Sequence, residues 1–416
     1  MGRLFSTTSL IITLLIIFLA EDAKAKKLVV SSQSGFKTIT KALQEVQDGD
    51  TILLKPGLYR EGSLKINKKI SLIGESFPVI DGENKYENLL VESDDVLIEG
   101  ILFKNSGSSS YMDIAALKIQ NSKNVVVRNN RFQDNFFGIH CMNSSFCTFE
   151  NNQLQSGNIK GKPAANGIHC WKSNHLKIAN NRVSGHRDGI YFEFVTKSTI
   201  ENNQSIGNKR YGLHFMFSHD DTYKHNTIKK NGAGVAVMYS KRVKMYQNVF
   251  AENWGNAAYG LLLKEIMDSH IENNVFENNT IAVFAEGANR ITMINNRFEK
   301  NGWALQIQAS CSDAYISLNN FIGNTFDVAT NGSLVMKYFD ENYWDKYEGY
   351  DLDRDGYGDI PHRPATFYSI IIQRNSGALM LFRSFFVKLM DKAETLFPNL
   401  TPENLKDNKP RMGKIR

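Results

Sequence analysis

Histidine, methionine and aromatic residues recur at matching places in six short segments in the middle of this 416-residue chain. The segments read GIHCM (138–142), GIHCW (167–171), GIYFE (189–193), GLHFM (212–216), GVAVM (234–238) and GLLLK (260–264). Each is typical of a strand whose side chains alternate between an inward and an outward face. The third positions then form one outward column: His140, His169, Tyr191, His214, Ala236 and Leu262. The fifth positions form a second column beside it: Met142, Trp171, Glu193, Met216, Met238 and Lys264.

Two interpretations of these columns remain open. Imidazole and thioether groups are ligands that suit a soft ion such as Cu(I). In that interpretation the ligands are the five histidines and methionines His140, Met142, His169, His214 and Met216. In the other, the face is a contact surface for a protein or a sugar. Its residues are then Trp171, Tyr191, Glu193 and Met238. Because Ala236 and Leu262 interrupt the histidines, neither interpretation gives a continuous ligand track beyond His214.

A second candidate site lies near the end of the chain. Asp351, Asp353, Asp355 and Asp359, with Gly356 at the sixth position, have the spacing of a Ca²⁺-binding loop. The twelfth position holds His362 instead of the usual glutamate. The segment is therefore predicted to be either a Ca²⁺ site or a turn rich in aspartate.

Catalytic signatures are weak by comparison. A glycoside hydrolase needs two or three carboxylates on one face, and His219-Asp220-Asp221 is the one local match, near a predicted turn. No phosphate-binding loop, GxSxG or HExxH motif occurs. We therefore predict that the chain is not an enzyme. A carbohydrate-active protein, whether lyase, hydrolase or binding module, is the alternative.

The elements that position these residues follow from a repeat of about 22 residues. The repeat is marked by Asn130, Asn152, Asn181, Asn203, Asn226, Asn248, Asn274, Asn296, Asn320 and Asn342. About three short strands fit one period, and the L-x-x-L-x-L frame of leucine-rich repeats is missing. The predicted fold is all-β, a right-handed single-stranded parallel β-helix. We expect the asparagines to adopt the left-handed conformation at one corner and to hydrogen-bond between coils.

Three parts are expected along the chain. Residues 1–25 read as a secretory signal peptide, with an apolar run before an A-x-A cleavage pattern. Residues 26–345 form the β-helix, and helical spacing within 36–46 predicts a cap over its first coil. Residues 346–416 hold the aspartate-rich loop and an amphipathic C-terminal segment.

The amphipathic segment spans residues 376–397. Its apolar residues Leu379, Phe382, Phe386, Leu389, Ala393 and Leu396 share one helical face. Charged residues interrupt it, so it is too polar to span a membrane. It is predicted to be either a cap on the last coil or a docking helix for a membrane partner.

The net charge limits the kinds of binding partner, and the cysteine positions limit the possible disulfides. The net charge of +6 is spread along the sequence, without the basic clustering of a nucleic-acid-binding protein. An acidic partner or a lipid surface is compatible with this charge. Cys141 and Cys170 occupy equivalent positions in adjacent coils, so they form either a disulfide or two buried thiols.

The G-[IL]-H segments, the export signal and the segment NYWDKYEGYDLDRDGYGDIPHRP (342–364) resemble the NosD family. The resemblance covers essentially the whole mature chain, and the segment after the repeats is its most specific part. It implies a periplasmic, non-enzymatic protein for maturation of nitrous oxide reductase. It also implies that the protein contacts the permease of an ABC transporter, works with a copper chaperone and helps assemble the copper–sulfide cluster of the reductase. Association with the membrane would then come through the partner.

Overall fold

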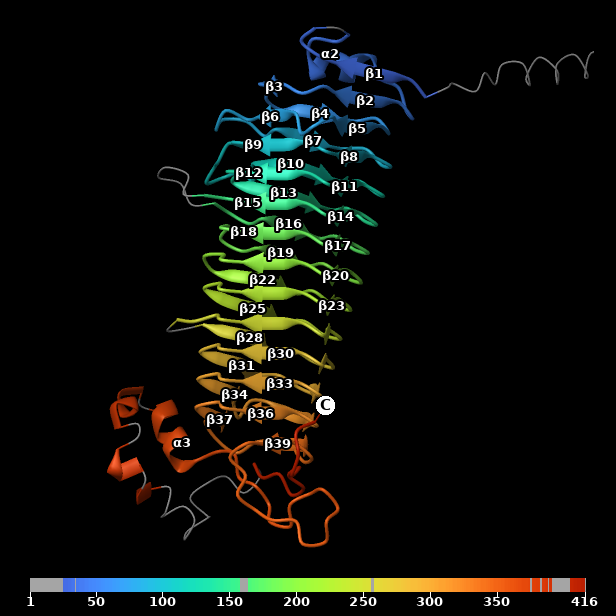
Figure 1. The fold of residues 1–416 in the computed structure, drawn as a ribbon. Helices are drawn as coiled ribbons and strands as arrows, with labels where there is room; N and C mark the ends of the chain where they lie inside the picture. Colours follow the sequence, from blue (N-terminus) through green and yellow to red (C-terminus); the bar gives the residue numbers. More distant parts are fainter. Residues whose placement is uncertain are drawn as a thin grey trace, which may run out of the picture.

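The computed structural model describes residues 25–33, 35–157, 164–255, 258–374, 376–381, 384–387, 389–390 and 405–415. Residues 1–24 of the expected signal peptide lie outside the described residues. The described chain winds into stacked coils, and each coil contributes strands to three parallel sheets (Figure 1). The predicted parallel β-helix is confirmed.

The first sheet is the longest of the three. Its strands are β1 (Lys27–Val30), β2 (Thr51–Leu54), β5 (Ser71–Gly74), β8 (Leu97–Glu99), β11 (Val126–Arg128), β14 (Thr148–Glu150), β17 (Lys177–Ala179), β20 (Thr199–Glu201), β23 (Thr222–Lys224), β26 (Lys244–Tyr246), β29 (His270–Glu272), β32 (Thr292–Ile294), β35 (Ser312–Ser317) and β38 (Val335–Tyr338).

The second sheet follows the first within each coil. Its strands are β3 (Leu58–Tyr59), β6 (Val79–Asp81), β9 (Leu102–Lys104), β12 (Arg131–Gln133), β15 (Gln153–Gln155), β18 (Arg182–Ser184), β21 (Gln204–Ile206), β24 (Thr227–Lys229), β27 (Val249–Ala251), β30 (Val275–Glu277), β33 (Arg297–Glu299), β36 (Asn320–Ile322) and β39 (Tyr343–Trp344).

The third sheet carries the histidine segments. Its strands are β4 (Leu64–Ile66), β7 (Leu89–Val91), β10 (Ala115–Gln120), β13 (Phe137–Met142), β16 (Ile168–Trp171), β19 (Ile190–Glu193), β22 (Tyr211–Met216), β25 (Ala233–Met238), β28 (Tyr259–Lys264), β31 (Ile281–Glu286), β34 (Trp303–Ile307) and β37 (Phe326–Ala329).

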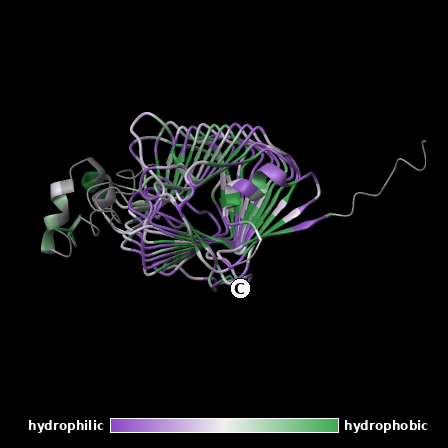
Figure 2. Ribbon diagram, turned by 90° about the horizontal axis from the view of Figure 1, so that it is seen from above, coloured by the Kyte–Doolittle hydropathy of each residue, from purple (hydrophilic) through white to green (hydrophobic). Residues whose placement is uncertain are grey.

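The inward side chains of all three sheets form one hydrophobic core that runs the length of the stack. The coils superimpose around this interior when viewed along the stack (Figure 2). On the second sheet, Phe250, Phe276, Phe298, Phe321 and Trp344 stack with successive ring-centroid distances of 4.6, 5.0, 4.9 and 4.0 Å. The strand register therefore places equivalent side chains in contact although the coils differ in length, which is how the sequence repeat specifies the core.

An asparagine ladder marks the corner between the first and second sheets. Each backbone N–H donates to the side-chain oxygen of the next asparagine, as from Asn181 to Asn203 and from Asn203 to Asn226, both at 2.9 Å. Two details of the prediction are wrong. The penultimate member is Asn319, because Asn296 N donates to Asn319 Oδ1, whereas Asn320 bonds Ile415.

The left-handed residue is also not the ladder asparagine. It is the residue before it, as at Asn129, Asn151 and Asn180, with φ of 56°, 56° and 55°. The turn therefore needs a left-handed residue one place earlier, which leaves the ladder side chain pointing inward.

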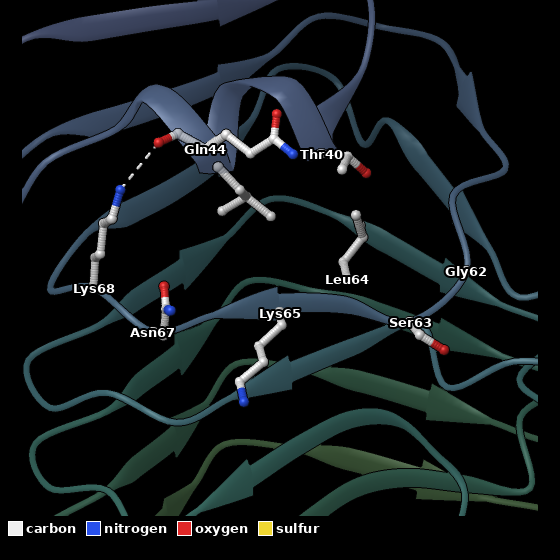
Figure 3. Close-up of a pocket in the computed structure, with 9 residues that line it drawn as sticks. Thr40, Gln44, Gly62, Ser63, Leu64, Lys65, Asn67 and Lys68 are labelled. Carbon is white, nitrogen blue, oxygen red and sulfur yellow. Dashed lines mark hydrogen bonds between the residues drawn. The ribbon is translucent and has the colours of Figure 1, made fainter.

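The first coil is covered by α2 (Ile39–Glu45). Thr38 caps the start of the helix, and Ile39 and Ala42 are buried against the core. Lys68 donates from Nζ to the Gln44 carbonyl at the other end of the helix, where a cation is favourable (Figure 3). The hollow between the helix and the first coil, drawn in that figure, has a volume of about 500 Å³ and belongs to this cap.

The last coil is closed by residues 405–415. Asp407 accepts hydrogen bonds from Asn342 N (3.0 Å), Glu341 N (3.1 Å) and Trp344 Nε1 (2.9 Å). It thereby satisfies the final donors of the asparagine ladder. Glycine N–H groups of the aspartate-rich loop extend this closure, since Gly358 N donates to Pro410 O at 2.8 Å.

Two helices lie beside the lower end of the stack, α3 (Phe367–Arg374) and a 3-10 helix η1 (Ser376–Leu381), with which the amphipathic segment begins (Figure 1). Val387 of that segment belongs to the same hydrophobic cluster at the third sheet as the residues of α3. Tyr368 and Ile372 pack against Trp303 and Phe326 at the edge of the third sheet. Phe382, Ala393 and Leu396 of the predicted helical face lie outside the described residues. No helix among the residues that the structure describes is long and apolar enough to cross a membrane.

Candidate functional site on the third sheet

The two columns lie in the register that the repeat predicts. His140 pairs with His169, His169 with Tyr191, and Tyr191 with His214. The column continues through Ala236 to Leu262. Beside it Met142, Trp171, Glu193, Met216 and Met238 are also in register. The alternation therefore separates these side chains from the core, which takes Ile139 and Cys141.

The outward column is not exposed, and that part of the prediction is wrong. His140, His169 and His214 have exposed fractions of only 3%, 9% and 4%. Phe137 lies beside the first two imidazoles, with ring centroids 5.5 Å from each. Tyr211 lies 4.8 Å from His214. These aromatic rings come from the residues immediately before the glycines and shield the imidazoles from water.

The glycines make this arrangement possible. A Cβ on Gly138 would lie 2.5 Å from the Gly167 carbonyl oxygen of the next coil. Phe137, directly before it, packs in a small outer cluster with Ala115 and Ala165 and not in the main core. The residue before each glycine is therefore available to cover the outer face.

The rings of the column form a continuous stack. Centroids are 4.7 Å apart from His140 to His169, 4.8 Å from His169 to Tyr191 and 4.6 Å from Tyr191 to His214. The planes of His140 and His169 are inclined by only 19°. Imidazole lone pairs lie in the ring plane, so two stacked rings do not aim at one point. A single ion held by both imidazoles requires one ring to turn.

Several ring nitrogens of the column have no hydrogen-bond partner. They are Nδ1 of His140, both nitrogens of His169 and Nε2 of His214. Burial lowers the pKa of His140 to about 4. Burial, followed by the charges of His140 and Arg187, lowers the pKa of His169 to about 3. Both imidazoles are therefore neutral at pH 7 and keep a free lone pair for a metal ion.

A buried carboxylate lies beside His214. Asp188 is fully buried and accepts hydrogen bonds from Arg210 Nε and Nη2 at 2.9 and 2.6 Å. Nδ1 of His214 is 3.4 Å from Asp188 Oδ2 and 3.0 Å from Arg210 Nη2. Burial raises the pKa of Asp188, but the hydrogen bonds and charges of His214 and Arg210 outweigh it, and the net pKa is lowered.

A signal for this pair exists in the sequence. Asp188 is the acidic member of a set of residues that precede the glycines, where the other segments have Phe137, Asn166, Tyr211, Ala233 and Tyr259. The pair fixes the environment of His214 Nδ1 and leaves Nε2 as the nitrogen without a partner.

The second column is only half-buried, at Met142, Trp171, Glu193, Met216 and Met238. Tyr191, predicted to share a contact surface with them, is itself buried and donates from its hydroxyl to Met216 Sδ at 3.5 Å. The accessible part of the face therefore consists of thioethers, one indole and one carboxylate.

The candidate acid pair does not share a face. Asp220 lies on an exposed turn and binds Arg242 through both oxygens, at 2.6 and 2.8 Å. Asp221 is buried and accepts a hydrogen bond from Ser198 N at 2.8 Å, and burial raises its pKa. The two carboxylates are consequently unable to flank one glycosidic bond.

The aspartate-rich loop brings three of its four predicted ligands together. Oxygen atoms of Asp351, Asp353 and Asp355 lie within 4.8 Å of one another. Asp359 instead accepts a hydrogen bond from Leu352 N at 2.8 Å. The four cysteines Cys141, Cys147, Cys170 and Cys311 are buried free thiols.

Comparison with known proteins agrees with this architecture. Residues 67–163 match the family model of the right-handed β-helix region, and residues 155–349 match that of the periplasmic copper-binding protein NosD. A probable ABC transporter binding protein NosD of Stutzerimonas stutzeri is 25% identical over 385 residues, covering 88% of this chain and 87% of the relative. The protein of the same description from Pseudomonas aeruginosa is 26% identical over 374 residues, covering 86% and 87%.

Solved structures show the same fold at low identity. The catalytic domain of a GH87 α-1,3-glucanase in complex with nigerose has a TM-score of 0.58 at 13% identity, covering 78% of this chain and 70% of that one. PfbA, a surface adhesin of Streptococcus pneumoniae, has a TM-score of 0.54 at 15% identity, covering 74% and 89%. The protein is thus a right-handed β-helix with a shielded imidazole column on one sheet. Within that class, the chain is similar to the NosD family, both in the family model that matches residues 155–349 and in two relatives that align over most of both chains.

Proposed function

We propose that this protein is a periplasmic accessory protein for assembly of the copper–sulfide site of nitrous oxide reductase. It works with a membrane ABC transporter and a copper chaperone, and it carries out no catalysis of its own. The match to the NosD family model and the names of the two relatives support this role. The observation that carries it is the column of shielded imidazoles with unpaired nitrogens beside thioethers.

Cu(I) is the cargo that this column suits. His140 and Met142 lie on one strand with one residue between them, as do His214 and Met216, so each pair shares the outer face. Nitrogen and thioether ligands favour Cu(I) over Ca²⁺ or Mg²⁺. His169 and Tyr191 separate the two pairs, so copper would occupy this face transiently at two places.

Two versions of the role give different results in cells that mature the reductase. If copper passes along the column, a His140→Ala, His169→Ala double variant lowers the copper content of the reductase. If the face only docks a partner, Trp171→Ala has the larger effect. Full copper content in the reductase with both variants would contradict any role of this face.

The transporter is proposed to bind the apolar surface of the C-terminal segment. Its exposed residues are Met380, Leu381, Phe385, Phe386 and Leu389. In the sequence they surround Val387, which packs with Tyr368 and Ile372 against the third sheet. A Phe385→Glu, Phe386→Glu variant should fold normally and no longer co-purify with the transporter from membranes. Loss of the melting transition in this variant would instead show a structural role.

Ca²⁺ binding by Asp351, Asp353 and Asp355 is a second proposal, supported by the convergence of their oxygens. The same loop bonds to the closing segment, with Met412 N donating to Gly356 O at 3.1 Å. A bound ion would hold that closure in place. Addition of EGTA should therefore lower the melting temperature of the wild type and leave that of Asp353→Asn unchanged.

A carbohydrate-active role is the alternative. The glucanase and the adhesin share the fold, and the fold alone does not bring their activities with it. The opposite orientations of Asp220 and Asp221 argue against it. Release of reducing ends or unsaturated uronates from pectin-type polymers, lost in Asp220→Asn or Asp221→Asn, would establish the alternative.

A further inference from the structure

Positive charge gathers along the edge where the second sheet leads into the third. Three stacked turns form this edge: residues 185–189, 207–211 and 229–233. Arg210 N donates to Arg187 O and Ala233 N to Arg210 O, which shows that the turns lie directly on one another. They contain five cations (Arg187, Lys209, Arg210, Lys229 and Lys230) and one acid, the buried Asp188, a net charge of +4.

Much of this charge is accessible. Arg187, Lys209, Arg210 and Lys230 are exposed, and Glu252 is shared between Lys229 and Lys230 at 2.7 and 3.5 Å. The edge borders the imidazole column, because Arg210 also contacts His214. An approaching anionic surface would thus be drawn to the opening of the candidate site.

Two insertions at this same corner present large exposed side chains. Tyr111 and Met112 lie between β9 and β10, with exposed fractions of 98% and 65%. Trp254 lies between β27 and β28 and is 57% exposed. In repeat proteins such insertions collect on the face that binds partners. Six coil spacings of about 4.8 Å separate β10 from β28 in the stack (Figure 1), which is about 29 Å.

From this arrangement we propose that the third sheet and its basic edge form the docking surface for a protein with an acidic face that exchanges cargo with the imidazole column. The inference rests on the proposed function and names the partner surface of the same site. A span of about 29 Å fits a standard interface of about 800 Å² per partner. Half-exposed Trp171, Met216 and Met238 supply the apolar centre, and the cations supply the charged rim.

The test compares two double charge reversals of equal size. Lys209→Glu, Lys230→Glu alters the basic edge, and Lys197→Glu, Lys241→Glu alters two exposed lysines at the opposite corner of the third sheet. The immobilised mature protein is probed with the purified copper chaperone and with the copper-free reductase. We expect the edge variant to bind at least one of them at least tenfold more weakly, mainly through slower association and with a weaker dependence on salt. The control should stay within twofold of the wild type.

Trp254→Ala provides an independent variant, for which we expect faster dissociation. Circular dichroism and the melting temperature confirm that each variant is folded. Equal binding by the wild type and the edge variant, equal weakening by both reversals, or no binding of either protein to the wild type would each overturn the proposal. So would binding of polygalacturonate that depends on the edge cations while both proteins fail to bind.

Copper retention separates this inference from the proposed function. The edge cations are not ligands, so the edge variant should retain Cu(I) as the wild type does. If the wild type retains no Cu(I) but partner binding still depends on the edge cations, copper binding by the column is wrong and the docking surface is supported. If Cu(I) is retained and partner binding does not depend on the edge cations, the docking surface is wrong and copper binding by the column is supported.

Discussion

Two of the buried polar columns of this β-helix, the asparagine ladder and the imidazole column, differ in how their polar atoms are satisfied. In the asparagine ladder, Asn203 Nδ2 donates to Ile178 O (2.9 Å), Glu201 O (3.0 Å) and Asn226 Oδ1 (3.0 Å). In the imidazole column, both nitrogens of His169 are without a partner at a similar depth. The same coil stacking creates both columns.

This difference indicates that the asparagine ladder stabilises the fold, whereas the imidazole column serves function. Buried polar groups are normally hydrogen-bonded, because an unpaired group loses its hydration without replacement. The ladder follows this rule and stabilises each corner. The imidazole column breaks it on one sheet, where the apolar cover keeps water away. We interpret the unpaired nitrogens as groups kept available for a ligand.

The largest effect should come from breaking the ladder. Asn203→Leu removes three donor bonds and leaves Asn181 N and Nδ2 without their acceptor. Each unsatisfied buried group costs about 1–3 kcal/mol, so we expect a total loss of about 3 kcal/mol in the free energy of unfolding. Chemical denaturation measures it. Gln204→Leu, on the exposed side of the adjacent strand, is the control and should change stability by less than about 0.5 kcal/mol.

A smaller, pH-dependent effect is expected where the ladder ends. Burial raises the pKa of Asp407 to about 6, against the hydrogen bonds from Trp344 and Asn342 that lower it. The unfolded pKa is about 3.9, so the folded state binds more protons between the two values. This contribution to stability is present below about pH 4 and is lost as the pH rises through about 6. Thermal melts from pH 4 to 7 should show the fall in the wild type and a flatter profile in Asp407→Asn.

The smallest change in stability is expected in the imidazole column. His169→Phe replaces an unpaired polar ring by an apolar ring of similar shape, between the rings of His140 and Tyr191. Such a replacement is close to neutral or stabilising. The melting temperature should stay the same or rise slightly. A fall comparable to that of Asn203→Leu would show that the His169 imidazole makes stabilising polar interactions and is not free for a ligand.

The sequence predicted what the repeat controls. The fold and the register of His140, His169 and His214 follow from strand alternation and the repeated phrase, and the cap at residues 36–46 follows from helical spacing. It did not predict burial of the column, because the cover comes from Phe137 and Tyr211, whose side chains break the alternation next to a glycine. Asn319 was confused with Asn320 because two adjacent asparagines fit the same phrase.

Side-chain contacts between residues far apart in the sequence were also not predicted. Asp407 closes a ladder whose last asparagine is 65 residues earlier, and no local pattern signals that contact. The bidentate pair of Asp188 and Arg210 joins residues in successive coils through side-chain geometry that periodicity does not describe. Periodicity therefore gives the scaffold and the alignment of columns, while exposure and pairing require the three-dimensional arrangement.

The central claim is that the unpaired imidazoles are kept for Cu(I). The most direct test is anaerobic titration of the isolated mature protein with Cu(I) against a competing chelator, followed by metal analysis after desalting. We expect the wild type to retain Cu(I) and Asn203→Leu, under conditions where it is folded, to retain the same amount. The His140→Ala, His169→Ala variant should retain less, keeping only the share bound near His214 and Met216. Absence of retained Cu(I) in the wild type, or equal retention by the double histidine variant, would contradict this claim.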